Sequence, residues 1–121
     1  MKTSLDHLPE TKRAQLRDIA AIFRDGAPVE MLILFGSHAR GDWVEDPDTG
    51  YRSDFDLLAV VDSDKIATDL TLWNEMERRA REVAGKTPVT LIVHDMKFVN
   101  HEIRIGQYFF GDVVNEGILL H

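Results

Sequence analysis

The stretch that decides the fold is Leu32-Ile33-Leu34-Phe35-Gly36-Ser37-His38-Ala39-Arg40-Gly41. An apolar run that ends in Gly-Ser and then turns polar is typical of a buried strand, here Val29–Phe35, that leads into a loop or the N-terminus of a helix. Backbone N–H groups at such a corner can hold a phosphate. A P-loop is excluded, because Asp42-Trp43 follows where that motif requires Lys and then Ser or Thr.

Three residues of this stretch, Gly36, Ser37 and Arg40, are candidate nucleotide-binding residues. Ser37 can donate its hydroxyl to a phosphate oxygen, and it can also cap a helix that begins at His38. We expect His38 to be a solvent-facing turn residue rather than a general base. Arg40 can contact phosphate, and its alternative partners are the nearby acids Asp42, Glu45 and Asp54.

A second strand, Asp54 to Val61, opens with two acids and continues as an apolar run. Because strand side chains alternate, Asp54 and Asp56 should point to one face of the sheet and Phe55 to the other. Two aligned carboxylates can hold Mg²⁺ or Mn²⁺, which bridges to a triphosphate. We therefore expect Asp54 and Asp56 to be the metal ligands and the catalytic residues. The alternative is a pair of strand-edge acids that are hydrogen-bonded to Ser37, Arg40 or the backbone.

The two segments together, G-S-x-A-R-G and then S-D-x-D-L with an apolar strand, resemble the nucleotidyltransferase superfamily that includes DNA polymerase beta and the aminoglycoside nucleotidyltransferases. The resemblance runs from about Val29 to the end of the chain. Among the members of this superfamily, the sequence is most similar to the small stand-alone or HEPN-associated minimal nucleotidyltransferase domains. It implies an α/β (α+β) fold in which helices pack against a palm-like mixed β-sheet of four to five strands. Residues 1–121 would form this single domain.

One position departs from the family pattern. In that family a third carboxylate commonly lies on the next strand, faces the first two, helps to hold the metal and can accept a proton. Here Thr90 takes its place, and a threonine hydroxyl neither neutralises Mg²⁺ nor acts as a base near neutral pH. Glu30, His94 and Asp95 are candidate substitutes, although Asp95 is expected mainly to cap the helix that follows it.

The resemblance implies a magnesium- or manganese-dependent transferase that moves a nucleoside monophosphate, AMP from ATP in the leading interpretation, onto a hydroxyl group. The acceptor would be a protein, such as a HEPN toxin, or a small molecule. The competing hypothesis follows from Thr90: a weak or inactive antitoxin or regulatory module that binds a HEPN ribonuclease. A third hypothesis is a structural domain whose acids are only hydrogen-bonded.

Composition narrows the partners and the compartment. A net charge of −7 on 121 residues repels a phosphate backbone, so broad nucleic-acid binding is not expected. The chain has no cysteine, which excludes disulfides and thiolate metal sites. Without a long apolar stretch or a signal core, a cytoplasmic protein with no membrane association is expected.

The remaining elements follow from hydrophobic spacing. The sequence predicts an amphipathic helix over about 9–25, one helix from the Ser63 or Asp64 cap to Gly85, and a strand over Val89–Val93. A second long helix should run from Met96 to Gly117, before a short last strand, 118–120. An ending on an apolar strand suggests that a further domain could follow His121.

Aromatic residues pose two further questions. Trp43 and Tyr51 lie in the acidic, turn-rich connection 42–52 and could stack on a base or anchor that loop. The group Gln107-Tyr108-Phe109-Phe110 is expected to be core. A docking surface for a neighbouring domain is the alternative for this group.

Overall fold

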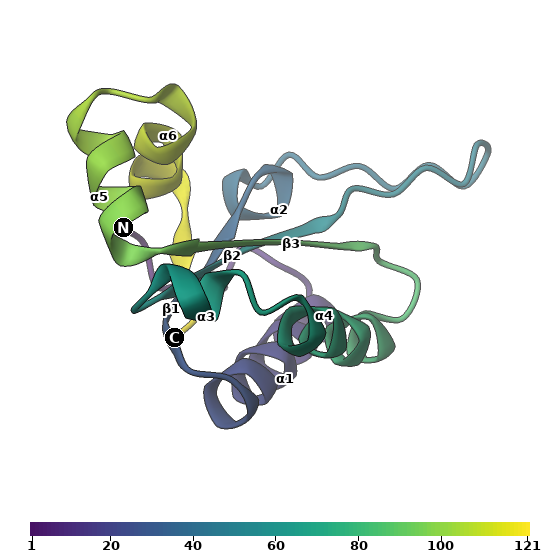
Figure 1. Ribbon diagram of the computed structural model, residues 1–121. Helices are drawn as coiled ribbons and strands as arrows, with labels where there is room; N and C mark the ends of the chain where they lie inside the picture. The colour runs from purple at the N-terminus through teal and green to yellow at the C-terminus, as the bar shows by residue number, and fades with distance from the viewer.

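A four-stranded mixed sheet forms the centre of the computed structural model, which describes residues 1–121 (Figure 1). Its strands are β1 (Val29–Phe35), β2 (Phe55–Val61), β3 (Val89–Asp95) and β4 (Ile118–Leu119). They lie in the order β3-β2-β1-β4, with β1 antiparallel to β2 and β4, and β2 parallel to β3. This arrangement confirms the predicted α+β fold with four to five strands.

Helices cover both faces of the sheet (Figure 1). One face carries α1 (Glu10–Gly26) and α4 (Leu70–Ala84), and the other carries α5 (Met96–Arg104) and α6 (Tyr108–Glu116). Two short helices, α2 (Ser37–Arg40) and α3 (Asp64–Ala67), follow β1 and β2. In Figure 1 the α5–α6 pair lies over one end of its face, and α2 lies at the other end of the sheet, where its Ala39 packs in the core cluster of α1 and α4. None of the helices combines the length and the hydropathy needed to cross a bilayer.

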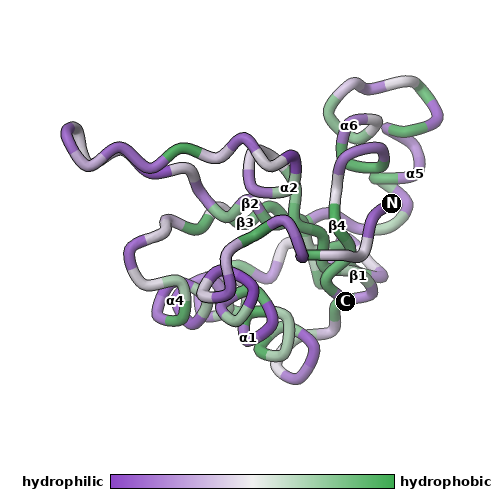
Figure 2. Tube along the Cα trace, turned by 180° about the vertical axis from the view of Figure 1, so that it is seen from behind, coloured by the Kyte–Doolittle hydropathy of each residue, from purple (hydrophilic) through white to green (hydrophobic).

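Alternation along the strands divides the core between the two faces. Leu32 and Leu34 pack with α1 and α4, whereas Ile33 belongs to the smaller cluster under α5 and α6. The central strand β2 is apolar toward both clusters, with Leu57 on one side and Leu58 on the other. Figure 2 shows the hydrophobic strands at the centre and the mostly hydrophilic 42–52 connection extending away from them.

Two of the three long predicted helices are interrupted, whereas the first, α1, is continuous. The helix expected after β2 divides at Thr68-Asp69, where the Asp69 carboxylate accepts from Leu72 N at 3.2 Å and starts α4. Ser63 caps α3, as one of the two predicted caps. The helix expected after β3 divides at Gly106, whose φ of +79° lies in the left-handed region that ends a helix. Hydrophobic spacing continues across both breaks, which is why a single helix was predicted in each case.

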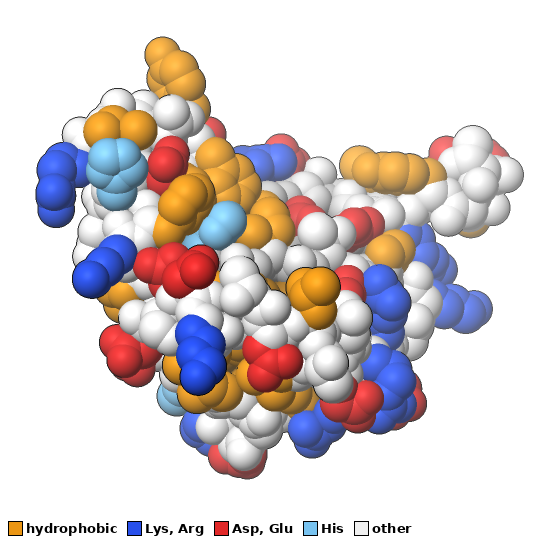
Figure 3. All heavy atoms as spheres, viewed as in Figure 1, with side chains coloured by type: hydrophobic (Ala, Val, Ile, Leu, Met, Phe, Trp, Pro, Cys, Tyr) orange, Lys and Arg blue, Asp and Glu red, His pale blue; other side chains and the backbone are white.

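The prediction that residues 107–110 are core was wrong except at Phe110. Phe110 is 6% exposed, but Tyr108 is 88% exposed and Phe109 39%. Because α6 begins at Tyr108, directly after the break, that side chain projects from the first turn away from the sheet. In Figure 3 hydrophobic side chains gather over the α5–α6 pair and the neighbouring sheet, and one projects from the tip of the pair.

Candidate functional site

The glycine corner after β1 touches the acidic start of β2. Phe35 pairs with Asp56 in the antiparallel register, so Gly36 follows directly beside that acid. A Cβ added to Gly36 would lie 2.3 Å from Asp56 Oδ2, and the φ of Gly36 is +75°. Both features require glycine here, because a side chain would strike the carboxylate and strain the backbone. The two halves of the predicted site are therefore in contact.

The acid pair lies on the α5–α6 face of the sheet. Asp56 alternates with Leu58, which packs under α5 and α6, whereas Phe55 points into the core on the opposite face. Thr90 is opposite Asp56 in the parallel register, and its hydroxyl donates to Asp54 Oδ2 at 2.5 Å. Asp54, Asp56 and Thr90 thus gather at the same end of the sheet.

The Asp56 carboxyl is poorly accommodated as a lone anion. Partial burial raises its pKa to about 6, and the negative charge of Asp54 raises it as well, while Arg40 opposes the shift. A bound cation between the two acids would relieve both the lost hydration and the repulsion. Burial and repulsion of the Asp56 anion therefore favour a site for a positively charged ligand over a pair of acids with a purely structural role.

The donor set suits a magnesium ion that arrives with its substrate. No group of three or more His, Cys, Asp or Glu side chains is placed to hold a metal. Two carboxylates completed by substrate phosphates and water are, however, the usual protein contribution to Mg²⁺ in phosphate chemistry. Asp54 and Asp56 fit that role, with Thr90 orienting Asp54 through its hydroxyl rather than adding a charge.

The three candidate substitutes for the missing acid do not reach this site. His94 and Asp95 pair with Val60 and Val61, at the far end of β2 from Asp56, and Glu30 lies at the same far end on β1. Four residues of strand span about 13 Å, which is too far for a shared metal. Asp95 instead caps α5 by accepting from Phe98 N at 3.1 Å, as its alternative role predicted.

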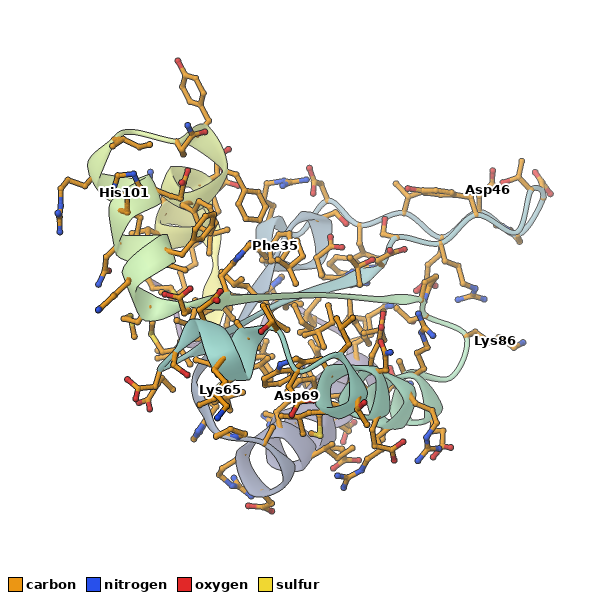
Figure 4. All side chains as sticks on the ribbon, viewed as in Figure 1. Phe35, Asp46, Lys65, Asp69, Lys86 and His101 are labelled. Atoms are coloured by element: carbon orange, nitrogen blue, oxygen red, sulfur yellow. The ribbon has the colours of Figure 1, made fainter.

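Two of the three candidate phosphate ligands line a pocket beside the acids. It holds about 230 Å³, and Figure 4 shows Phe35 rising from the sheet beside it. Arg40 is exposed and lies 3.3 Å from Asp42 and 3.8 Å from Glu116, so of its predicted acid partners only Asp42 is confirmed. The lining residues are Phe35, Gly36, Arg40, Phe109, Asp112, Val113 and Glu116.

Ser37 differs from its predicted position. It is the first residue of α2, Gly36 occupies the N-cap, and no side-chain cap hydrogen bond forms. The prediction that Ser37 caps a helix starting at His38 was therefore wrong by one residue. Since the Ser37 hydroxyl is not used as a cap, it stays a candidate donor to a ligand oxygen.

The prediction that His38 faces solvent was also wrong. Its side chain is fully buried, with Nδ1 at 2.7 Å from the Asp54 carbonyl oxygen and Nε2 at 3.1 Å from Lys12 Nζ. Lys12 is only 7% exposed and is not among the predicted site residues. The spacing of Lys12 with Leu16 places it on the apolar face of α1, and that signal could have revealed it.

The 42–52 connection folds back on itself and projects away from the body of the molecule (Figure 1). Glu45 and Arg52 form an isolated antiparallel bridge, and Glu45 also pairs with Lys12 at 2.7 Å. Trp43 stacks on His38 with centroids 5.7 Å apart, which fits the predicted anchor role, whereas Tyr51 is 60% exposed.

The chain matches no protein-family model, and no curated protein matches it.

Proposed function

We propose that this protein is a nucleotidyltransferase that transfers AMP from ATP to a hydroxyl group of a protein or small-molecule acceptor, with Mg²⁺ or Mn²⁺ as cofactor. The observation that carries the proposal is the contact between the Gly36 backbone and the Asp56 carboxylate. A phosphate held at this corner lies within reach of a divalent ion held by Asp54 and Asp56. The resemblance of this sequence to nucleotidyltransferases rests on these same residues.

Each residue of the site has a defined task in the proposed reaction. Asp54 and Asp56 hold the metal ion, which when bound withdraws charge from the phosphates and aligns them for in-line displacement. The backbone at Gly36 and the hydroxyl of Ser37 bind phosphate oxygens, and Arg40 neutralises the tail. The acceptor oxygen bonds to the α-phosphorus and releases its proton to solvent water, while the bond from the α-phosphorus to the bridging oxygen breaks and pyrophosphate leaves.

The pocket beside Gly36 offers room for the nucleoside. Phe35 and Phe109 supply apolar ring surface, with centroids 5.2 Å apart, on the floor and the α6 wall. The carboxylates of Asp112 and Glu116 can accept hydrogen bonds from ribose hydroxyls or an exocyclic amine. A mostly apolar recess with a few acceptors at its rim is typical of nucleoside recognition.

Label transfer tests this proposal directly. The protein is incubated with Mg²⁺, ATP labelled at the α-phosphate, and the product of its neighbouring gene as acceptor. We expect labelled acceptor, and loss of the label with Asp54→Asn or Asp56→Asn. The matched control is Asp62→Asn, because Asp62 is an exposed acid just beyond the other end of β2. Equal labelling by wild type and both site variants would contradict the proposal.

A second candidate function is a regulatory or antitoxin module that inhibits a HEPN ribonuclease by contact. Two observations favour it: Thr90 stands where the family places an acid, and the α5–α6 pair exposes apolar side chains (Figure 3). The exposed set comprises Phe98, Ile103, Ile105, Tyr108, Phe109 and Val114. Inhibition that survives Asp54→Asn and Asp56→Asn but is lost with Tyr108→Ala would select this function over catalysis.

A further inference from the structure

A buried chain of hydrogen bonds connects α1 to the acidic start of β2. Lys12 Nζ lies 3.1 Å from His38 Nε2, and His38 Nδ1 lies 2.7 Å from the carbonyl oxygen of Asp54. Both side chains belong to the few polar groups buried in this protein. These hydrogen bonds reach Asp54 from the sheet face that carries α1 and α4, opposite the face that carries Asp56.

The chemistry of the partners determines which nitrogen of His38 carries the proton. Lys12 also pairs with Glu45 at 2.7 Å, so it is an ammonium group, which donates and cannot accept. His38 Nε2 must therefore accept from Lys12. The carbonyl of Asp54 can only accept, so His38 Nδ1 must donate to it. Only the neutral Nδ1–H tautomer satisfies both contacts.

Two aromatic neighbours hold the ring of His38 in place. Trp43 stacks on it at an interplanar angle of 9°, and Phe55 meets it edge-on at 4.7 Å between centroids. The backbone of this residue is fixed as well, because His7 Nε2 donates to the main-chain carbonyl oxygen of His38 at 2.7 Å. The ring cannot turn away from Asp54 without losing its stacking on Trp43 and its contact with Phe55.

The peptide unit between Asp54 and Phe55 is fixed at both of its polar atoms. Its carbonyl accepts from His38, and its N–H, which belongs to Phe55, donates to Pro88 O at 2.8 Å. Fixing this plane sets the direction of the side chain that precedes it. The Asp54 carboxylate is then held by Thr90 on the other side.

We infer that Lys12 and His38 are positioning residues, which hold the Asp54 backbone through the Nδ1–H tautomer of His38 and so align Asp54 with Asp56 for a divalent cation. This inference rests on the proposed function for the identity of the ligand, but the tautomer and the backbone constraint do not depend on it.

Two variants of His38 separate positioning from packing. In His38→Asn the amide nitrogen lies near the place of Nδ1 and can still donate to the Asp54 carbonyl. In His38→Gln the amide reaches the place of Nε2 and can meet Lys12, but no donor remains for Asp54. Both variants remove the ring, so a merely structural role predicts equal effects.

Three readouts on the full chain test the inference. Nitrogen NMR of the wild type should show His38 protonated at Nδ1. Amide exchange of Phe55 should stay slow in His38→Asn and become at least tenfold faster in His38→Gln. Affinity for Mn²⁺ alone, measured by electron paramagnetic resonance, should fall about tenfold or more in His38→Gln, because losing a group that orients a metal ligand commonly costs at least about tenfold in affinity. In His38→Asn the affinity should stay within about threefold of the wild type.

Each contrary result would overturn a different part of this inference. A proton on Nε2 would refute the tautomer, and equal exchange or equal Mn²⁺ affinity in the two variants would refute positioning. If the wild type binds no Mn²⁺, the proposed function and the alignment of a cation site fail together. NMR and amide exchange would then decide whether His38 holds the Asp54 backbone.

Discussion

At the scale of single residues, a substitution at Gly36 tests the close approach of the glycine corner to Asp56. Gly36→Ala would place a methyl group 2.3 Å from Asp56 Oδ2 at a φ of +75°. We expect a loss of about 1–3 kcal/mol in the free energy of unfolding and a loss of nucleotide binding. Urea denaturation measures the first effect, and titration calorimetry the second.

A glycine without these constraints provides the control. Gly111 lies inside α6 with nothing within 4 Å of an added Cβ and without a positive φ. Gly111→Ala should therefore raise the free energy of unfolding by about 0.5–1 kcal/mol, because alanine favours the helix. A Gly36→Ala protein as stable as the wild type would show that the corner does not touch the acid.

Asp56 makes the stability of the metal-free protein depend on pH. Its pKa rises from 3.8 to about 6 on folding, so between these values the folded protein binds more protons than the unfolded chain. This group therefore lowers the free energy of unfolding as pH rises from about 4 to 6. Asp56→Asn should be more stable than the wild type by about 1 kcal/mol at pH 7.5, after allowance for solvent screening, and no more stable at pH 3.5.

Urea denaturation of both proteins at the two pH values, without metal, checks this sign. A difference that is the same at pH 3.5 and pH 7.5 would mean that the Asp56 pKa is not raised.

At the scale of elements, the strands were easier to predict than the helices. Alternation and apolar runs located β1 and β2 to within a residue, because a buried strand leaves its period in the sequence. The breaks at Asp69 and Gly106 were missed, since the apolar spacing continues across them. Only the local capping chemistry of Asp69 and the positive φ of Gly106 mark the true ends.

The α6 helix carries a prediction about the nucleoside pocket. Phe109 lines the pocket and packs edge-on against Phe35 at 5.2 Å. Phe109→Ala should weaken binding of a fluorescent ATP analogue about three- to tenfold, the value of one aromatic contact. Val114→Ala is the matched control, because Val114 is as exposed as Phe109 on the same helix but does not line the pocket. Equal effects of the two substitutions would place the nucleoside elsewhere.

At the scale of the whole molecule, the predicted site divides into a part that is local in sequence and a part that is not. Gly36, Asp54 and Asp56 could be named because their spacing and alternation are written in two adjacent segments. The burial of His38 could not, because α1, α2, the 42–52 connection and β2 must all assemble around it. The distance of the candidate substitutes for the third acid from the site could not be predicted for the same reason, since only the sheet register places them at the far end of β2.

We propose above all that the glycine corner and the acid pair bind one triphosphate together through a divalent ion. Titration calorimetry with an ATP analogue that cannot be cleaved between the α- and β-phosphates, with Mg²⁺ and with EDTA, tests it most directly. We expect binding that requires Mg²⁺ in the wild type and a loss of that requirement, together with most of the affinity, in Asp54→Asn and Asp56→Asn. Binding that is equally strong with EDTA and in both variants would contradict it.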